Sequence, residues 1–450
     1  MFLTIFICLI LNKSRNFYLI QVRNLFMKIL DIPYEKYSLS NKLEVILYNI
    51  KNIPLVAVNI WYKVGSANEV KGKTGLAHLF EHMMFQGSRN IPKEMHFKYI
   101  QEAGGTLNAS TSFDRTNYFE KLPSNELELP LWLESDRMGF FLDSLDITKL
   151  NNQKSVVLNE RLERYDNQPY GLAWEKLITN IYPEEHPYSW PTIGFYNDIE
   201  SYTVEDVKSF FQKYYSPANS SIVIAGNIDV RKTKLLIEKY FGEIKNFGIP
   251  QEINSKLPHL DTNKVISYED NVTLERIYLA WHSPNAFHDD DSALDVLADV
   301  LTGSKNARLS RKLIYELEIA QDVNAMQFSG KYGGHFMIVA TAKPGKSLNE
   351  IKKIIFEEIS RLSEEMISSQ ELERSKNVIK SHFIYSLQNI DTIADLMNLY
   401  NFYLGEPNSF NFDLNRYSSL NEDNIKEAAL KYLQKNYVEL RITPRRNNGN

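Results

Sequence analysis

The chain has 450 residues, too many for one compact core, so about two to four domains are expected. Hydrophobic residues make up 43% and charged residues 24%, with a formal net charge of -5, which is the balance of a globular rather than a disordered protein. This mild acidity, without a stripe of lysine and arginine, argues against nucleic-acid binding. Cys8 is the only cysteine, which excludes an intrachain disulfide and a thiolate metal site.

The beginning of the chain differs from the rest. Residues 2–11 are apolar but too few to span a bilayer as a helix, and they lack the basic start and the cleavage site of a signal peptide. We interpret residues 1–26 as a non-native extension or a weak leader, with Met27 as the natural start. No firm membrane segment is then expected. A cytoplasmic location is favoured and a periplasmic one stays open, because a chain without disulfides suits a reducing compartment.

The first part of the chain alternates between strand and helix patterns. Residues 43–50 and 55–64 alternate apolar and polar residues and predict two antiparallel strands. Thr74 is expected to cap a helix over 75–85. The pattern then predicts a helix, sheet, three helices, a strand and a last helix, over 97–103, 107–122, 126–142, 144–164, 204–214, 221–226 and 230–241.

Residues 242–260 lose the apolar period and contain prolines, which is typical of a linker. After it the order of elements returns in outline. Strands are predicted over 275–282, 323–328 and 336–343, and helices over 290–301, 307–318, 348–362 and 370–403. The chain is therefore predicted to be α+β, with two related halves over 27–241 and 261–450, each a mostly antiparallel sheet packed with helices.

The chemistry is concentrated in one motif. His78, Glu81 and His82 form an H-x-x-E-H run inside the helix predicted over 75–85. Residues four apart lie on the same face of a helix, so both imidazoles can bind one metal ion. Catalytic zinc needs a third protein ligand and an open position for water, from which Glu81 can take a proton. The run is the known motif of inverted zincins; the alternative is a solvated helix face with two incidental histidines.

A third ligand is expected from another helix. The helix predicted over 144–164 offers Glu160 and, one turn later on the same face, Glu163. Both carboxylates are suitable zinc ligands, and the residues alone leave the choice between them open.

The stretch 61–88, WYKVGSANEVKGKTGLAHLFEHMMFQGS, resembles the pitrilysin/insulinase family, which includes mitochondrial processing peptidase. That family takes its third ligand from the end of a V-x-x-x-E pattern well downstream of the motif, where this chain has Glu160. The resemblance therefore implies one zinc ion held by His78, His82 and Glu160. Glu163 is then an outer carboxylate or, as we favour, a solvated helix residue.

The resemblance extends over most of the chain. The run Asn108, Ala109 and Ser110 is similar to the family's strand beside the active site, which binds the substrate backbone by β-augmentation. Without the family, Asn108 reads equally well as a turn residue after two glycines. The landmark around His186 is interpreted as structural, with this histidine hydrogen-bonded in a loop.

The chain also departs from the family pattern. Single-chain members carry an arginine and a tyrosine in the second half that touch the substrate, and Ile314 and Gln321 occupy these places here. Gln153 replaces an acidic residue often found before the third ligand. The departures imply a homologous partner chain that supplies the missing side chains, or a homodimer.

The residues and the resemblance together predict a zinc-dependent endopeptidase. Unfolded peptides would be held in extended form in a chamber between the halves, with Glu81 as the general base. The alternative is a non-catalytic scaffold, like the core subunits that relatives contribute to respiratory complexes. An intact set of His78, Glu81, His82 and Glu160 argues against that alternative.

Overall fold

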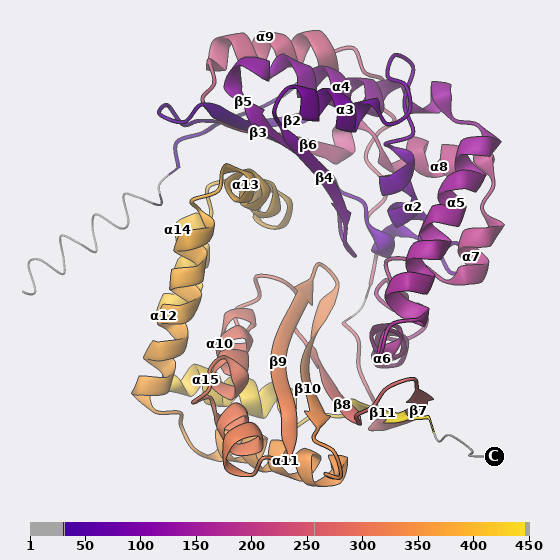
Figure 1. Cartoon of the computed structure of the whole chain (residues 1–450). Coiled ribbons are helices and arrows are strands. Elements are labelled where there is room, and N and C mark those ends of the chain that lie inside the picture. Colours follow the sequence, from indigo (N-terminus) through magenta and orange to yellow (C-terminus); the bar gives the residue numbers. More distant parts are fainter. Residues whose placement is uncertain (1–29, 31, 256, 446–450) are drawn as a thin grey trace, which may run out of the picture.

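A computed structural model shows two α+β halves, each built on one sheet with helices packed on it (Figure 1). The structure describes residues 30, 32–255 and 257–445. The predicted extension over 1–26, with Met27, therefore lies outside the described residues. Among the helices that are described, none combines the length and the apolar character needed to cross a membrane.

The first sheet contains β1 (Glu35–Ser38), β2 (Glu44–Asn49), β3 (Leu55–Tyr62), β4 (Thr106–Thr111), β5 (Thr116–Pro123) and β6 (Ser220–Gly226). Their spatial order is β1-β2-β6-β3-β5-β4, which leaves β4 at an edge. All neighbours run antiparallel except β2 and β6. Strands β3 and β6 are buried along nearly their whole length, so both faces of the sheet are covered there.

The second sheet contains β7 (Lys264–Asp270), β8 (Arg276–Ser283), β9 (Ala320–Gly330), β10 (Gly333–Ala342) and β11 (Tyr437–Pro444), in the order β7-β11-β8-β10-β9. Apart from β1, this is the order of the first sheet, with the one parallel pair at the same place (β7 with β11, as β2 with β6). The repeated topology confirms the prediction of two related α+β halves.

The structure refines two predicted details. Strands β2 and β3 run in opposite directions, as predicted, but they are not neighbours, because β6 lies between them. The long helical region predicted over 370–403 is two helices, α12 (Ser369–Ser386) and α13 (Ile390–Leu404). An apolar pattern identifies a strand or helix but not its neighbour, and the break at residues 387–389 has no glycine or proline to mark it.

Helices of each half cover the outer face of its own sheet (Figure 1). Phe80, Phe141, Phe211 and Tyr215 are buried together in the main core of the first half. The helices of this half are α2 (Leu76–Met83), α3 (Met95–Glu102), α4 (Glu128–Phe140), α5 (Ile147–Arg161), α6 (Ala173–Ile181), α7 (Tyr196–Ser201), α8 (Val204–Tyr214) and α9 (Val230–Phe241). Those of the second half, besides α12 and α13, are α10 (Asp291–Thr302), α11 (Leu348–Glu364), α14 (Phe410–Ser418) and α15 (Glu422–Ala428).

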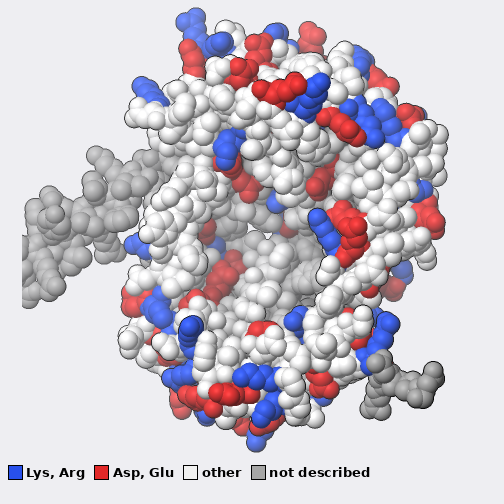
Figure 2. All heavy atoms as spheres, viewed as in Figure 1, with Lys and Arg blue, Asp and Glu red and all other residues white. Residues whose placement is uncertain are grey.

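The inner face of each sheet is covered by a helix from the other half. Helix α13 packs Ile393 and Met397 against Ala57 and Val223 of the first sheet. Reciprocally, α6 packs against β8 and β11, where Leu177 and Ile181 meet Ala280, Val438 and Leu440 of the second sheet. Each fully buried aliphatic side chain contributes about 1.5–3 kcal/mol. This exchange ties the halves together, and the molecule is hollowed between them (Figure 2).

A single carboxylate joins the halves beside this hollow. Asp114, in the turn between β4 and β5, accepts hydrogen bonds from Tyr188 Oη (2.6 and 2.8 Å), Tyr403 Oη (2.8 Å) and the backbone N–H of Lys331 (2.9 Å). Tyr403 belongs to α13, and Lys331 lies in the turn between β9 and β10. Burial raises the pKa of Asp114, against these donors. One turn of the first half therefore holds two segments of the second.

Buried histidines lie at the same junction between the halves. His335 on β10 lies directly opposite His282 on β8, and its Nδ1 is 2.9 Å from Tyr182 Oη of the first half. Burial lowers the pKa of His282 to about 4 and that of His335 to about 3. Both imidazoles are therefore neutral in the folded protein at neutral pH.

These histidines predict loss of stability in mild acid. Below their ordinary pKa of 6.5 the unfolded chain takes up protons that the folded chain cannot bind until pH reaches about 4. The free energy of unfolding should fall by about 1.4 kcal/mol per pH unit for each group across that window. Thermal unfolding midpoints between pH 7 and pH 5 measure this. His282→Gln and His335→Gln should flatten the slope, and the exposed His382→Gln should not; equal slopes in all four proteins would contradict the assignment.

Candidate active site

Helix α2 carries the H-x-x-E-H motif and is fixed at its N-terminus by a buried carboxylate. Glu69 accepts hydrogen bonds from the backbone N–H groups of Gly75 (2.8 Å) and Ala77 (2.7 Å). A carboxylate at this position also interacts favourably with the helix dipole. Thr74, predicted as the N-cap, has a different role: its hydroxyl donates to Asp198 (2.7 Å), and the N-cap is Gly75 with φ 88°.

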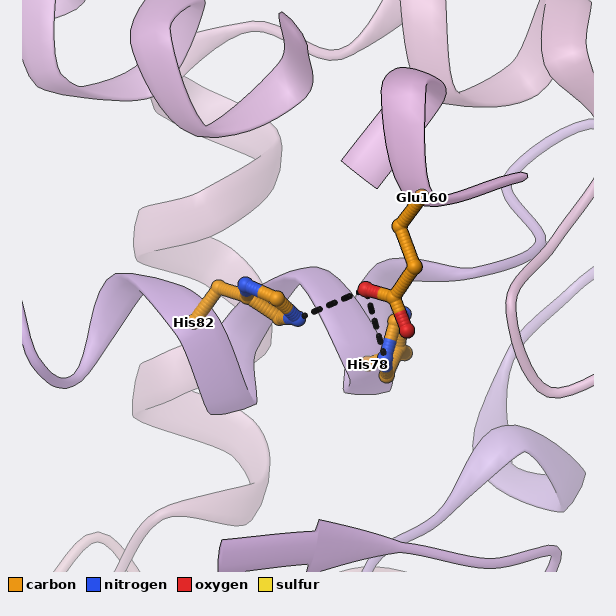
Figure 3. Close-up of side chains that lie close together, drawn as sticks. All are labelled: His78, His82 and Glu160. Atoms are coloured by element: carbon orange, nitrogen blue, oxygen red, sulfur yellow. Dashed lines mark ion pairs between the residues drawn. The ribbon is translucent and has the colours of Figure 1, made fainter. Parts of the chain in front are cut away.

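The two histidines of α2 face a carboxylate from the end of α5 (Figure 3). Glu160 Oε2 lies 3.3 Å from His82 Nε2 and 3.8 Å from His78 Nε2. The three ligand atoms all lie within 4.8 Å of one another, close enough to hold one metal ion. The structure thus brings together the three residues that the sequence predicts as zinc ligands, from helices far apart in the chain.

The donor set fits zinc. Burial, with His82 adding to it, lowers the pKa of His78 to about 4, so this imidazole is in the neutral form that binds metals. Its Nδ1 is buried without a hydrogen-bond partner, and its Nε2 lies beyond hydrogen-bond distance of Glu160. Hydrogen bonding by His82 lowers the pKa of Glu160, which keeps the carboxylate ionised. Two imidazoles and one carboxylate are a known ligand set of catalytic zinc.

Glu81 lies beside this group but is held by a different partner. Its Oε2 accepts a hydrogen bond from Thr111 Oγ1 (2.6 Å) at the end of β4. Burial raises the pKa of Glu81, while Thr111 acts in the opposite direction. A raised pKa makes a carboxylate a stronger proton acceptor, as a general base near neutral pH requires.

The residues predicted to bind substrate form the edge of the first sheet. Asn108, Ala109 and Ser110 lie in β4, which pairs with β5 on one side only. The strand assignment decides against the turn alternative for Asn108. The backbone N–H of Ala109 is bonded to the side-chain oxygen of Asn108 (2.9 Å) instead of to a neighbouring strand. Within the described chain, the outer side of β4 therefore has no strand partner.

Other residues singled out in the sequence lie away from the cluster. Glu163 is exposed in the π-helical turn Leu162–Asp166 that follows α5. His186 is a hydrogen-bonded loop residue, whose Nε2 meets the carbonyl oxygen of Tyr332 (3.1 Å) and whose Nδ1 accepts from the N–H of Tyr188 (3.1 Å). Ile314 packs against the core of the second half, Gln321 is exposed, and Gln153 is buried in α5.

Sequence reasoning missed two residues that orient the site. Glu69 carries no local signal, since it acts from a loop several residues before the helix. Arg164, one turn after Glu160, places Nη1 2.7 Å from Glu160 Oε1 and leaves Oε2 to face the histidines (Figure 3). Its i, i+4 spacing from a carboxylate is a signal that could have identified it.

Comparison with known proteins agrees with this geometry. Residues 44–192 match the profile described as insulinase (peptidase family M16), and residues 201–379 match the profile described as the peptidase M16 inactive domain. The zinc protease PqqE of Helicobacter pylori is 30% identical over 367 residues, which cover 81% of this chain and 82% of that protein. The chain belongs to the insulinase family. This finding confirms the resemblance seen in the sequence.

A solved structure shares this fold over nearly the whole chain. A crystal structure of a protease from Helicobacter pylori matches 92% of this chain and 100% of its own, with a TM-score of 0.86 and 28% identity. A further relative is named as the probable β subunit of the mitochondrial-processing peptidase of Arabidopsis thaliana; it is 22% identical over 368 residues, or 80% of this chain and 68% of that protein. The chain is thus a member of a peptidase family with relatives named zinc proteases.

Glu69 provides a test of how α2 is held. Glu69→Gln keeps one acceptor oxygen, so one of the two bonded N–H groups of α2 loses its partner at a cost of about 1–3 kcal/mol. We expect a lower thermal unfolding midpoint and weaker zinc binding, measured by calorimetry and by competition with a chromophoric chelator. The exposed Glu185→Gln serves as the matched control. If Glu69→Gln bound zinc as tightly as the control, Glu69 would have no part in positioning the site.

Proposed function

We propose that this chain is a zinc-dependent endopeptidase that hydrolyses unfolded peptides. The observation that carries the proposal is the convergence of His78, His82 and Glu160, with Glu81 beside them and an unpaired strand edge next to Glu81. Metal ligands, a base and a place for an extended chain are the parts that metal-assisted peptide hydrolysis needs.

One zinc ion per chain is proposed, held by His78, His82 and Glu160. In the part of the chain that the structure describes, no other group of three or more such side chains is close enough to share an ion. When bound, zinc supplies a Lewis acid that polarises a carbonyl and lowers the pKa of water. Arg164 supports the ligand set by binding the other oxygen of Glu160.

Glu81 is proposed as the general base. It takes a proton from the attacking water and then delivers it to the nitrogen of the leaving amine. Thr111 fixes the carboxylate through Oε2, and no residue of the described chain binds Oε1, so this oxygen is available for proton transfer. The raised pKa of Glu81 makes its carboxylate a stronger acceptor for the proton of the attacking water.

The substrate is proposed to lie as an added strand along β4. Backbone groups of alternate residues face the free edge of β4, so a peptide would exchange hydrogen bonds with Ala109, flanked by Asn108 and Ser110. It would displace the Asn108 side chain from the N–H of Ala109. Only an extended chain can pair with the edge of β4 in this way. This constraint supports unfolded peptides as the substrate class.

Zinc content and peptide cleavage, measured together, test the site. We expect about one zinc per chain and cleavage of an unfolded-peptide mixture in the wild type. Glu81→Gln should keep the zinc and lose cleavage by at least about 100-fold. Glu160→Gln should lose most of the zinc, whereas Glu163→Gln, its exposed neighbour, should behave as the wild type. Zinc without cleavage under every condition would favour a non-catalytic scaffold, and absence of zinc from the wild type would refute the proposal.

A homologous partner chain, or a second copy of this chain, is proposed to complete the substrate site. The places of the family's substrate-binding arginine and tyrosine hold Ile314 and Gln321, of which the first packs into the core and cannot reach a peptide. The Arabidopsis relative is itself named as a subunit.

We expect the cleavage rate per zinc site to rise when a homologous chain from the same organism is co-expressed, or with chain concentration for a homodimer. Light scattering would report the molar mass of each species. Full activity of a monomer at every concentration would show that the chain needs no partner.

A further inference from the structure

The strand that faces the proposed substrate carries a cation whose charge the chain leaves unpaired. Arg115 follows β4 in the tight turn to β5, and its guanidinium folds back over the strand. Nη1 donates to the carbonyl oxygen (2.9 Å) and to the hydroxyl (2.6 Å) of Ser110. The guanidinium also stacks on the ring of Trp61 with 5.2 Å to the centroid. These contacts fix its position at the edge of the sheet.

The face that holds this guanidinium is the one that looks into the hollow. Ser110 pairs with Asn117, and Asn117 pairs with Trp61, so the three form one row across the sheet. Asp395 of α13 accepts hydrogen bonds from Asn117 (3.1 Å) and Trp61 (2.8 Å), which places the row on the inner face. Arg115 lies over this row, close enough to Asp395 and Tyr403 of α13 for their charges to act on its guanidinium.

Arg115 has no ion-pair partner among the described residues. Asp395, Glu81 and Asp114 influence it through space, but no carboxylate of the described chain lies within 4.0 Å of its guanidinium. Nη1 is used by Ser110, while Nε and Nη2 bind no other described side chain or carbonyl. These two nitrogens form the fork that binds a carboxylate through two parallel hydrogen bonds. A half-buried guanidinium with a free fork gains most from a ligand of opposite charge.

A peptide added to β4 brings such a ligand to the right place. Neighbouring strands lie about 4.8 Å apart, and directly opposite residues point their side chains to the same face. The peptide residue opposite Ser110 therefore directs its side chain to the inner face, which is the face that carries the guanidinium of Arg115. The adjacent residue of β4 is Thr111, which holds Glu81, so this position lies next to the bond that would be cut.

We infer that Arg115 is a specificity-determining residue, which selects peptides with an aspartate or glutamate opposite Ser110, next to the scissile bond. The inference rests on the proposed function, since it takes the peptide to lie along β4. Arg115 would give this chain a substrate preference that the zinc ligands and the backbone of β4 cannot supply, because neither of them contacts a substrate side chain.

Binding can be measured without cleavage in the full chain carrying Glu81→Gln and loaded with zinc. The probes are labelled unfolded peptides of neutral sequence, in which one glutamate is moved through every position, each compared with its glutamine counterpart by fluorescence anisotropy. We expect glutamate to tighten binding about tenfold or more at one position. Arg115→Ala should abolish this ratio, and Arg115→Lys should keep part of it. Arg115→Glu should reverse it in favour of lysine peptides, and the exposed Arg231→Ala should leave it unchanged.

A merely structural role for Arg115 would give a different result. Its loss would then weaken glutamate and glutamine peptides equally, and the ratio would not change; that outcome would overturn the inference while the peptidase proposal stands. The same holds if the wild-type side chain gives no preference at any position. If no peptide binds to any variant and the wild type cleaves none, the proposed function fails, and the inference fails with it.

Discussion

Both faces of the central strands are apolar, and the rest of the structure depends on this constraint. Strands β3, β6 and β10 are buried along nearly their whole length, so each sheet needs a packed layer on either side. Each half supplies its own outer layer, but the inner layer is a helix from the other half, α13 or α6. The sheets are thereby held face to face (Figure 1), and the hollow between them (Figure 2) is a consequence of how their inner faces are covered.

The site forms where that inner layer ends. Helix α13 packs on β3 and β6, whereas β4 at the edge keeps a partly exposed surface. Helix α2 approaches this edge, where Thr111 meets Glu81, and α5 brings Glu160 to the histidines. Burial keeps His78 neutral, and His82 and Arg164 favour the ionised form of Glu160. His78 and Glu160 therefore favour the protonation states in which such side chains bind metal ions.

The sequence pattern predicted the features that depend on neighbouring residues, such as the ends of individual helices. Helices α8 (Val204–Tyr214) and α9 (Val230–Phe241) have the predicted bounds, because Thr203 and Asp229 cap amphipathic segments whose ends are fixed within a few residues. The neighbours of β2 and the pairing of β7 with β11 depend on contacts between distant segments, and no local pattern contains them. The same limit applies to Arg115, which falls within the sheet predicted over 107–122, since the pattern does not show what its guanidinium reaches.

The metal-ligand candidates also differ in how far their positions depend on neighbouring residues or on distant segments. His78 and His82 share one helix, so their spacing alone predicts that they face one ion. Glu160 could be preferred to Glu163 only through the family, because an ideal helix would place both on one face. In the structure α5 ends at Arg161 and continues as a π-helical turn, whose wider winding carries Glu163 away from the histidines. That change of winding leaves no trace in an apolar pattern.

Because each sheet is covered by a helix from the other half, folding of the first half cannot be completed until much of the second half has been synthesised. Ala57 and Val223 of the first sheet stay uncovered until α13 is available. Helix α13 leaves the ribosome only after β10 and α12 have been synthesised. Until then the N-terminal half carries an uncovered apolar strip, the kind of surface that chaperones protect. A fragment cut between α9 and β7 would keep that strip permanently, even though it contains His78, His82 and Glu160. The segment with the chemistry therefore cannot cover its whole sheet with its own residues.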